Sequence, residues 1–275
     1  IIVCGACKHR FRVDGTTEPS TAHVICPMCG SAENRIAEFP IFAGSRFFID
    51  RTTWLRPLHR FDAVVLRNPE RPASLTVKRI VGMPGETIGF AGGRAIINGE
   101  PVAPSLDCLA RMSQPVYEMR QGMPVPEPVL HRHWIADASG PWQLKDGVWT
   151  HNIQPPDKQE SSPLLTFRNI GPKPGLDDTL AEEPITEMSV FNSVLPYRQT
   201  ESMPSPSLLL ELKINTPHDQ ADITIQTPDG HSETYPVASG KWLRVPIPNL
   251  SARPFSISFP SLQWAELTEI RIRRE

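Results

Sequence analysis

The chain has 275 residues, of which 39% are hydrophobic, so it is long enough for two domains with packed cores. Its formal net charge of −2 argues against a general binder of polyanions. Thirty prolines against 17 glycines favour strands, turns and ordered loops over long helices. No apolar run approaches the length of roughly 18 residues that a membrane span needs, and no signal peptide is recognisable.

Two C-x-x-C pairs, separated by eighteen residues, lie within residues 1–33. Cys4, Cys7, Cys26 and Cys29 have the spacing of a four-cysteine zinc site, in which each pair presents two thiolates to one tetrahedral ion. Disulfides or a redox pair are alternatives, but two matched pairs exceed what a redox motif needs. Because this segment is too small to bury a core, bound zinc would supply its folding free energy. The sequence therefore predicts a structural zinc ribbon.

Several other residues near the cysteines and beyond could bind a ligand, but a structural role is favoured for each. The basic stretch KHRFR (8–12) admits a nucleic-acid binder, although so short a charge run is usually a solvated face. Cys108 is predicted to be a small buried hydrophobe. His131 and His133 could chelate a metal from one strand, but no third ligand is evident nearby. No nucleic-acid partner is expected.

Residues 34–120 read as short strands followed by one short helix after residue 105. The strands are expected in RFFIDRT, DAVVLRN, LTVKRIVG, ETIGFAGG and RAIINGE, with AGG and NG at the reversals. Lys78 lies in the middle of one strand, and alternation places it on the face of Thr76 and Ile80. A solvated lysine is the commoner reading. If both faces are covered, however, desolvation lowers the lysine pKa, and a neutral amine can activate a serine hydroxyl as general base.

The C-terminal half combines an irregular part with a strongly alternating one. Residues 121–183 are rich in Pro, Asp, Gly and Trp and are predicted to be an irregular excursion. Within 184–275, alternation predicts five strands of a β-sandwich, with Trp242 and Trp264 expected in its core. The alternating positions are Leu208, Leu210, Leu212 and Ile214, Ile223 and Ile225, Leu243, Val245 and Ile247, Phe255, Ile257 and Phe259, and Ile270 and Ile272.

The stretch VKRIVGMPGETI around Lys78 resembles the lysine box of type I signal peptidases, the Ser–Lys endopeptidases of peptidase family S26. AGSRFFIDR (43–51), RFDAVVLRNPE (60–70) and RAIINGEPV (94–102) resemble three further boxes of that family, in the same order. The resemblance implies a mostly β catalytic core with Lys78 as general base. It also implies cleavage of signal peptides from exported preproteins, on the extracytoplasmic side of the bacterial cytoplasmic membrane. In such an enzyme the Lys78 amine is expected to be mostly buried beside an open cleft.

The serine box of the family has no counterpart in this chain. The local stretch 36–44 places Ala37 where the serine should stand, and Ser45 aligns with an aspartate, so it is interpreted as a turn residue. Signal peptidases of planctomycete bacteria resemble this chain in carrying a C-x-x-C ribbon after the serine box and a lectin-like β-sandwich insertion. Together with a start that lacks methionine, this predicts an inactive fragment whose serine and membrane anchor lie upstream.

The sequence therefore predicts a mostly β chain of four parts. These are a zinc ribbon (1–33), a partial S26 core (34–120), an irregular excursion (121–183) and a lectin-like β-sandwich (184–275). The function expected from the resemblance is signal-peptide removal by the full-length parent. The alternative is a noncatalytic binding protein, in which a degenerate S26 core, the ribbon and the sandwich serve as interaction surfaces.

Overall fold

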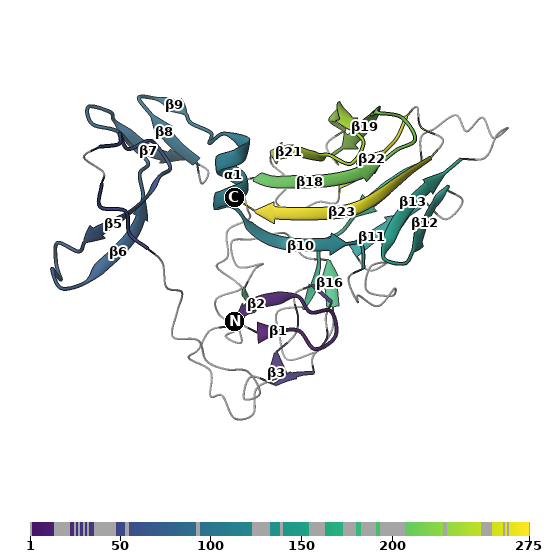
Figure 1. The fold of residues 1–275 in the computed structure, drawn as a ribbon, viewed down its shortest axis with the longest axis horizontal. Coiled ribbons are helices and arrows are strands. Elements are labelled where there is room, and N and C mark those ends of the chain that lie inside the picture. Colours follow the sequence, from purple (N-terminus) through teal and green to yellow (C-terminus); the bar gives the residue numbers. More distant parts are fainter. Residues whose placement is uncertain are drawn as a thin grey trace. The chain divides into compact units, whose positions relative to one another are not determined.

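In a computed structural model the chain folds into two compact units (Figure 1). Unit 1 comprises Ile1–Ile41 and Ser113–Glu275, and unit 2 comprises Phe42–Met112, which is therefore inserted into the sequence of unit 1. The chain is mostly β, which confirms the predicted fold class. The structure describes residues 2–13, 23–24, 26, 28–29, 31, 33–35, 48–52, 55–91, 94–122, 133–137, 140–153, 163–172, 180–182, 191–192, 207–227, 230–248, 255–260, 262 and 264–274.

The larger sheet of unit 1 is antiparallel and has six strands. They are β10 (Gln114–Arg120), β12 (Trp142–Lys145), β13 (Val148–Asn152), β18 (Ser207–Asn215), β21 (Trp242–Pro248) and β23 (Trp264–Arg274). β23 is central, because it pairs with β18 along one edge and with β13 and then β10 along the other (Figure 1). β12 extends the sheet beyond β13, and β21 extends it beyond β18.

The smaller sheet of unit 1 has five antiparallel strands. They are β11 (Trp134–Ala136), β14 (Leu165–Phe167), β19 (Gln220–Gln226), β20 (Ser232–Ala238) and β22 (Phe255–Ser258). Both sheets contribute to one buried cluster, in which Trp134 of the smaller sheet packs 6.4 Å from Tyr117 of the larger one, ring centre to ring centre. Alternating side chains explain this packing, since Leu208, Leu210 and Leu212 of β18 are each almost fully buried.

The segment 121–183, expected to be irregular, contributes strands to both sheets. β11, β12, β13 and β14 all come from it, and β15 (Ile170–Pro172) pairs with β16 (Leu180–Glu182) in a separate hairpin. These strands are only three to five residues long, and β13 buries consecutive residues, so no clean alternation marks them. Trp242 and Trp264 also differ from expectation, because both are only half-buried.

The cysteine-rich segment packs into unit 1 as well. Its strands are β1 (Ile2–Val3), β2 (Arg10–Val13), β3 (His23–Val24) and β4 (Asn34–Arg35), and β2 also pairs in parallel with β17 (Phe191–Asn192). Ile2, Phe11 and the four cysteines belong to the same buried cluster as the core of the two sheets. The segment therefore shares its hydrophobic core with the sheets.

Unit 2 consists of small sheets and one helix. Its elements are β5 (Ala63–Arg67), β6 (Leu75–Arg79), β7 (Ile88–Ala91), β8 (Arg94–Ile97), β9 (Glu100–Pro101) and α1 (Leu106–Met112). β5 and β6 form a hairpin, and β7, β8 and β9 form a three-stranded meander. The strand expected in RFFIDRT is absent from the described residues 48–52, where Asp50 instead accepts a hydrogen bond from the backbone N–H of Thr52 in a local turn.

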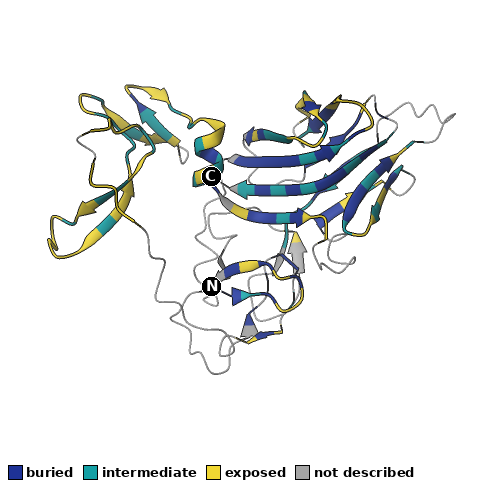
Figure 2. Ribbon diagram, viewed as in Figure 1, coloured by how far each residue is buried: buried dark blue, intermediate teal, exposed yellow. Residues whose placement is uncertain are grey.

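Unit 2 exposes many of its apolar side chains, and most of β5 and β6 is yellow in Figure 2. Ten of the eleven large hydrophobic residues described as exposed lie in it, whereas only Ile97 and Leu109 of its described residues are buried. A soluble domain rarely leaves so much apolar surface uncovered. Across the described ranges of both units, no helix combines the length and apolarity that crossing a membrane requires.

Candidate functional site

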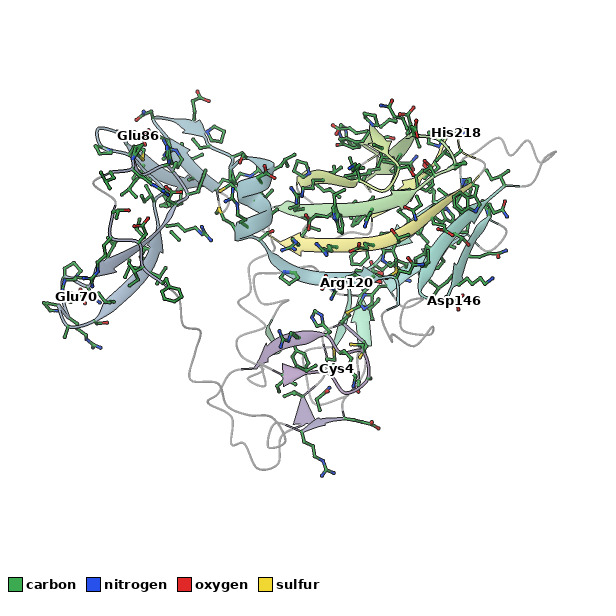
Figure 3. All side chains as sticks on the ribbon, in the orientation of Figure 1. Cys4, Glu70, Glu86, Arg120, Asp146 and His218 are labelled. Atoms are coloured by element: carbon green, nitrogen blue, oxygen red, sulfur yellow. The ribbon has the colours of Figure 1, made fainter. Side chains whose placement is uncertain are left out.

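The four cysteines lie in two tight turns of unit 1. Cys4 and Cys7 lie between β1 and β2, where Figure 3 labels Cys4, and Cys26 and Cys29 lie between β3 and β4. Backbone bonds close both turns: the N–H of Cys4 donates to the carbonyl of His9 at 2.9 Å, and that of Cys26 donates to the carbonyl of Ser31 at the same distance. Each turn directs two thiols inward.

The structure brings all four predicted metal ligands together. Their sulfurs lie within 4.8 Å of one another, with 3.5 Å between Cys4 and Cys29 and 3.6 Å between Cys7 and Cys26. Four thiolates around a tetrahedral zinc, at about 2.3 Å each, are about 3.8 Å apart, so the sulfur cage matches the size of such an ion. The four side chains are buried and could hold a metal ion.

The electrostatics of the cage favour at least one thiolate. Hydrogen bonds from neighbouring thiols, above all from Cys26, lower the pKa of Cys4 far below its usual 9.0. A hydrogen bond with Cys26 likewise lowers the pKa of Cys29, to about 7. A divalent cation would complete the deprotonation that these contacts begin, because thiolates are the form that binds metal.

Asn34 is a residue of this centre that the motif did not reveal. It is almost fully buried at the start of β4, and its side-chain carbonyl accepts a hydrogen bond from Gly5 N at 3.1 Å. Its amide donates to Val24 O and Ser31 O, at 3.2 and 2.9 Å. Asn34 therefore braces the first cysteine turn against the second. No sequence motif marks a single asparagine that links two turns, so the sequence could not have revealed this role of Asn34.

Lys8 supplies the positive backbone angle that closes the first cysteine turn. Its φ is 61°, a conformation that residues other than glycine adopt rarely. Its ammonium donates to Gly5 O at 2.8 Å. Gly30, which follows the second pair of cysteines, lies outside the described residues.

Lys78 lies on β6, as predicted, and faces Val64 of β5 in the register of the hairpin. Its side chain is exposed, contrary to the expectation of a mostly buried amine. No ion pair joins it to another described residue. Among the described strands β6 pairs with β5 alone, and the amine is not desolvated.

The turn after Lys78 is held by a compact polar network. Glu86, labelled in Figure 3, accepts hydrogen bonds from the guanidinium of Arg60 and from the backbone N–H of Met83, both at 2.6 Å. The Arg60 contact, followed by that of Met83, lowers the pKa of the Glu86 carboxyl. Arg60 also donates to the carbonyl of Val81, so one side chain ties the chain before β5 to the chain after β6.

Backbone conformation and steric space explain two glycines of this turn. Gly85 has a φ of +86°, which only glycine adopts readily. A Cβ on Gly82 would lie 2.1 Å from Cδ1 of Ile88, so a side chain there would force Ile88 to move. The turn therefore favours glycine at position 85, whereas a side chain at position 82 would displace only the flexible end of Ile88.

The remaining candidate residues take structural places or fall outside the described residues. Phe11 of the basic stretch is buried in the shared core. Cys108 is only half-buried, with its sulfur 3.4 Å from that of Met112. Ala37 and Ser45 lie outside the described residues, and His131 does too.

A comparison with protein families matches residues 34–148 to the family model described as "Signal peptidase, peptidase S26". Signal peptidase I V of Bacillus subtilis (strain 168) is 38% identical over 48 residues, which is 18% of this chain and 27% of that protein. Signal peptidase I of Leptolyngbya laminosa is 41% identical over 44 residues, 16% of this chain and 21% of that protein. The matches support the S26 resemblance, and this chain covers only about a quarter of those relatives.

Solved structures resemble this chain only weakly. The structure of PfGH50B matches with a TM-score of 0.32 and 12% identity, over 52% of this chain and 22% of that one. A mutant of CBM29-2, a family 29 carbohydrate binding module, matches with a TM-score of 0.30 and 8% identity, over 59% of this chain and 91% of that one. At such scores neither similarity indicates a shared fold or a shared ligand.

Proposed function

We propose that this chain is part of a type I signal peptidase, a Ser–Lys endopeptidase that removes signal peptides from exported preproteins. The match of residues 34–148 to the S26 family model carries the proposal. The enzyme acts on the extracytoplasmic side of a bacterial cytoplasmic membrane, to which an anchor outside these 275 residues holds it. The cysteine-rich segment and the two-sheet unit support a likeness to the planctomycete signal peptidases.

Lys78 is the general base in this proposal. Its neutral amine takes the proton of a serine hydroxyl as the serine oxygen attacks the carbonyl carbon of the scissile bond. It later returns the proton to the leaving amine. The network of Arg60, Glu86 and Met83 fixes the turn that ends the strand of this lysine.

The serine comes from a part of the parent protein outside these residues, and the exposed apolar surface of unit 2 supports this. Leu66, Leu75 and Val77 of the β5–β6 hairpin are all exposed, as are Ile88 and Phe90 of β7. Polypeptide that covers this surface would also desolvate Lys78, whose amine must be neutral to act as a base. The chain alone is therefore inactive.

The four cysteines hold a structural zinc ion in this proposal. All-sulfur ligation in a closed, buried cage leaves no open coordination position for substrate, which is typical of structural zinc sites.

The test uses the full-length parent and a preprotein with a signal peptide. Cleavage should fall by at least about a thousandfold in Lys78→Ala, because removing a member of a catalytic dyad has effects of this order. The control Lys145→Ala, an exposed lysine of β12, should cleave normally. Cleavage by residues 1–275 alone that persists in Lys78→Ala would contradict both the assigned base and the absence of the serine.

A noncatalytic binding protein is the second candidate, and the exposure of Lys78 favours it. In this case a degenerate S26 core, the ribbon and the two-sheet unit are interaction surfaces. Normal processing of preproteins by the parent would exclude it, whereas a parent that binds a preprotein without cutting it would establish it.

A further inference from the structure

His133 links the second cysteine turn to the core of the two sheets. It directly precedes β11, and its ring is almost fully buried. The ring Nε2 lies 2.6 Å from the carbonyl oxygen of Met28, and Nδ1 lies 3.2 Å from that of Arg168. Both partners are carbonyl oxygens, which can only accept, and a neutral imidazole carries one N–H. The shorter contact assigns this proton to Nε2, which donates to Met28.

The Met28 carbonyl belongs to the peptide unit that leads into a metal ligand. Met28 lies between Cys26 and Cys29, and its carbonyl shares a peptide bond with the N–H of Cys29. Hydrogen bonds with the Cys29, Cys4 and Cys7 thiols and burial raise the pKa of Cys26, and a hydrogen bond from the backbone N–H of Cys29 to its sulfur acts in the opposite direction. One planar peptide therefore accepts from His133 at its oxygen and donates to a ligand sulfur at its nitrogen. Hydrogen bonds in such a chain polarise and strengthen one another.

The ring cannot readily turn away from this peptide. Tyr117 packs against it with 5.1 Å between ring centres, and Phe167 stacks against it at 6.2 Å and 14°. Both aromatic rings also contact Trp134, at 6.4 and 5.1 Å, so the imidazole is held by the aromatic core of both sheets. The orientation of the peptide before Cys29 is thus set by the two-sheet core.

We propose that His133 is a positioning residue of the four-cysteine metal centre, which holds the Met28–Cys29 peptide so that its N–H supports the Cys26 thiolate. The two-sheet core therefore contributes to metal retention, although none of its side chains touches the ion. This inference rests on the metal centre proposed above and is independent of any peptidase activity.

The test compares variants that separate the donor from the packing. His133→Phe keeps an aromatic ring but loses the N–H, and His133→Gln keeps an N–H but loses the ring. His151→Phe is the matched control, because His151 is another fully buried histidine of unit 1 whose ring contacts are with Trp142 and Phe259, away from the cysteines. Each protein is loaded with Co²⁺, and transfer of the metal to a chelator is followed through the thiolate-to-cobalt absorption.

His133→Phe should release cobalt about tenfold faster than the unmodified chain, since loss of a residue that orients metal ligands typically costs 10–100-fold in affinity. His133→Gln should release cobalt at a rate close to that of the unmodified chain, and His151→Phe should release it at the unmodified rate. Equal release from His133→Phe and the unmodified chain would overturn the role of His133. No cobalt binding by the unmodified chain would instead overturn the metal centre.

A measurement on the unmodified chain covers the case in which His133→Phe does not fold. Nitrogen NMR of the histidine rings distinguishes a protonated from an unprotonated Nε2. A proton on Nε2 of His133 supports the donated bond to Met28, and an unprotonated Nε2 refutes it.

Discussion

His151 should make the stability of unit 1 depend steeply on pH in mildly acidic solution. Its ring on β13 is fully buried between Trp142 and Phe259, at 4.9 and 5.6 Å between ring centres. Neither ring nitrogen has a hydrogen-bond partner among the described residues. Burial penalises the charged imidazolium and so lowers the pKa of His151 from 6.5 to about 4.

The sign follows from which state binds the proton more readily. The unfolded chain, with a pKa near 6.5, takes up a proton at a higher pH than the folded chain does, so stability falls as the pH drops from about 6.5 to about 4. With these two values, a change from pH 7 to pH 5 removes about 2 kcal/mol from the free energy of unfolding. His151→Phe fills the same apolar site without a titratable group, and this loss should disappear.

The assay is denaturant unfolding of both proteins at pH 7 and pH 5, followed by tryptophan fluorescence. Protonation of the cysteines also destabilises the chain in acid, but it affects both proteins equally and cancels in the difference. The two proteins should therefore differ by about 2 kcal/mol in how much stability they lose. The reasoning is refuted if both lose the same amount, or if NMR titration of the folded protein gives His151 a pKa near 6.5.

The remaining predictions concern the metal centre and a buried ion-pair network. Cys26→Ser should reduce bound zinc from roughly one ion per chain to a small fraction, measured by elemental analysis, because one of four thiolates is lost. Glu211→Ala should destabilise unit 1 by about 2–3 kcal/mol in denaturant unfolding, since its buried carboxylate accepts hydrogen bonds from Arg244 and Arg273 at 2.9 and 2.7 Å. Glu233→Ala, at an exposed site of β20, should shift the unfolding midpoint far less than Glu211→Ala does, because its contacts with Tyr235 and His231 are exposed to solvent.

The parts of the fold that the sequence predicts best are those with a strong local signal. Alternation in β18 and β23 predicts one buried face, and the structure buries those residues, although in β18 it also buries Leu209 and Glu211 of the other face. The spacing of the four cysteines predicts that they converge on one metal ion, and the structure brings their sulfurs within 4.8 Å of one another. In both cases the residues that carry the pattern also make the contacts, so no distant partner had to be known.

Where the prediction failed, the deciding contacts come from far along the chain. β11 and β14 are three residues long. β11 pairs with β14, and β14 also pairs with β22, so their conformation depends on residues about 30 to 90 positions away. Likewise, no pattern in HRHW indicates that His133 contacts Met28, which lies 105 residues earlier. Lys78 is a different case. Its strand was predicted, but the exposure of its amine depends on which other segments pack over that strand, and the sequence of the strand alone does not determine this.

The central place of β23 in the larger sheet has a consequence for biosynthesis. β10, β13 and β18 all pair with this strand, and the contact between Glu118 and Arg271 spans 153 residues. A ribosome releases these three strands first, so their apolar faces stay without their central partner until residues 264–274 emerge. The hairpin of β5 and β6 closes over a few residues and can form much earlier. Unit 1, although it begins first, is therefore completed last, and the nascent chain exposes its future core throughout synthesis.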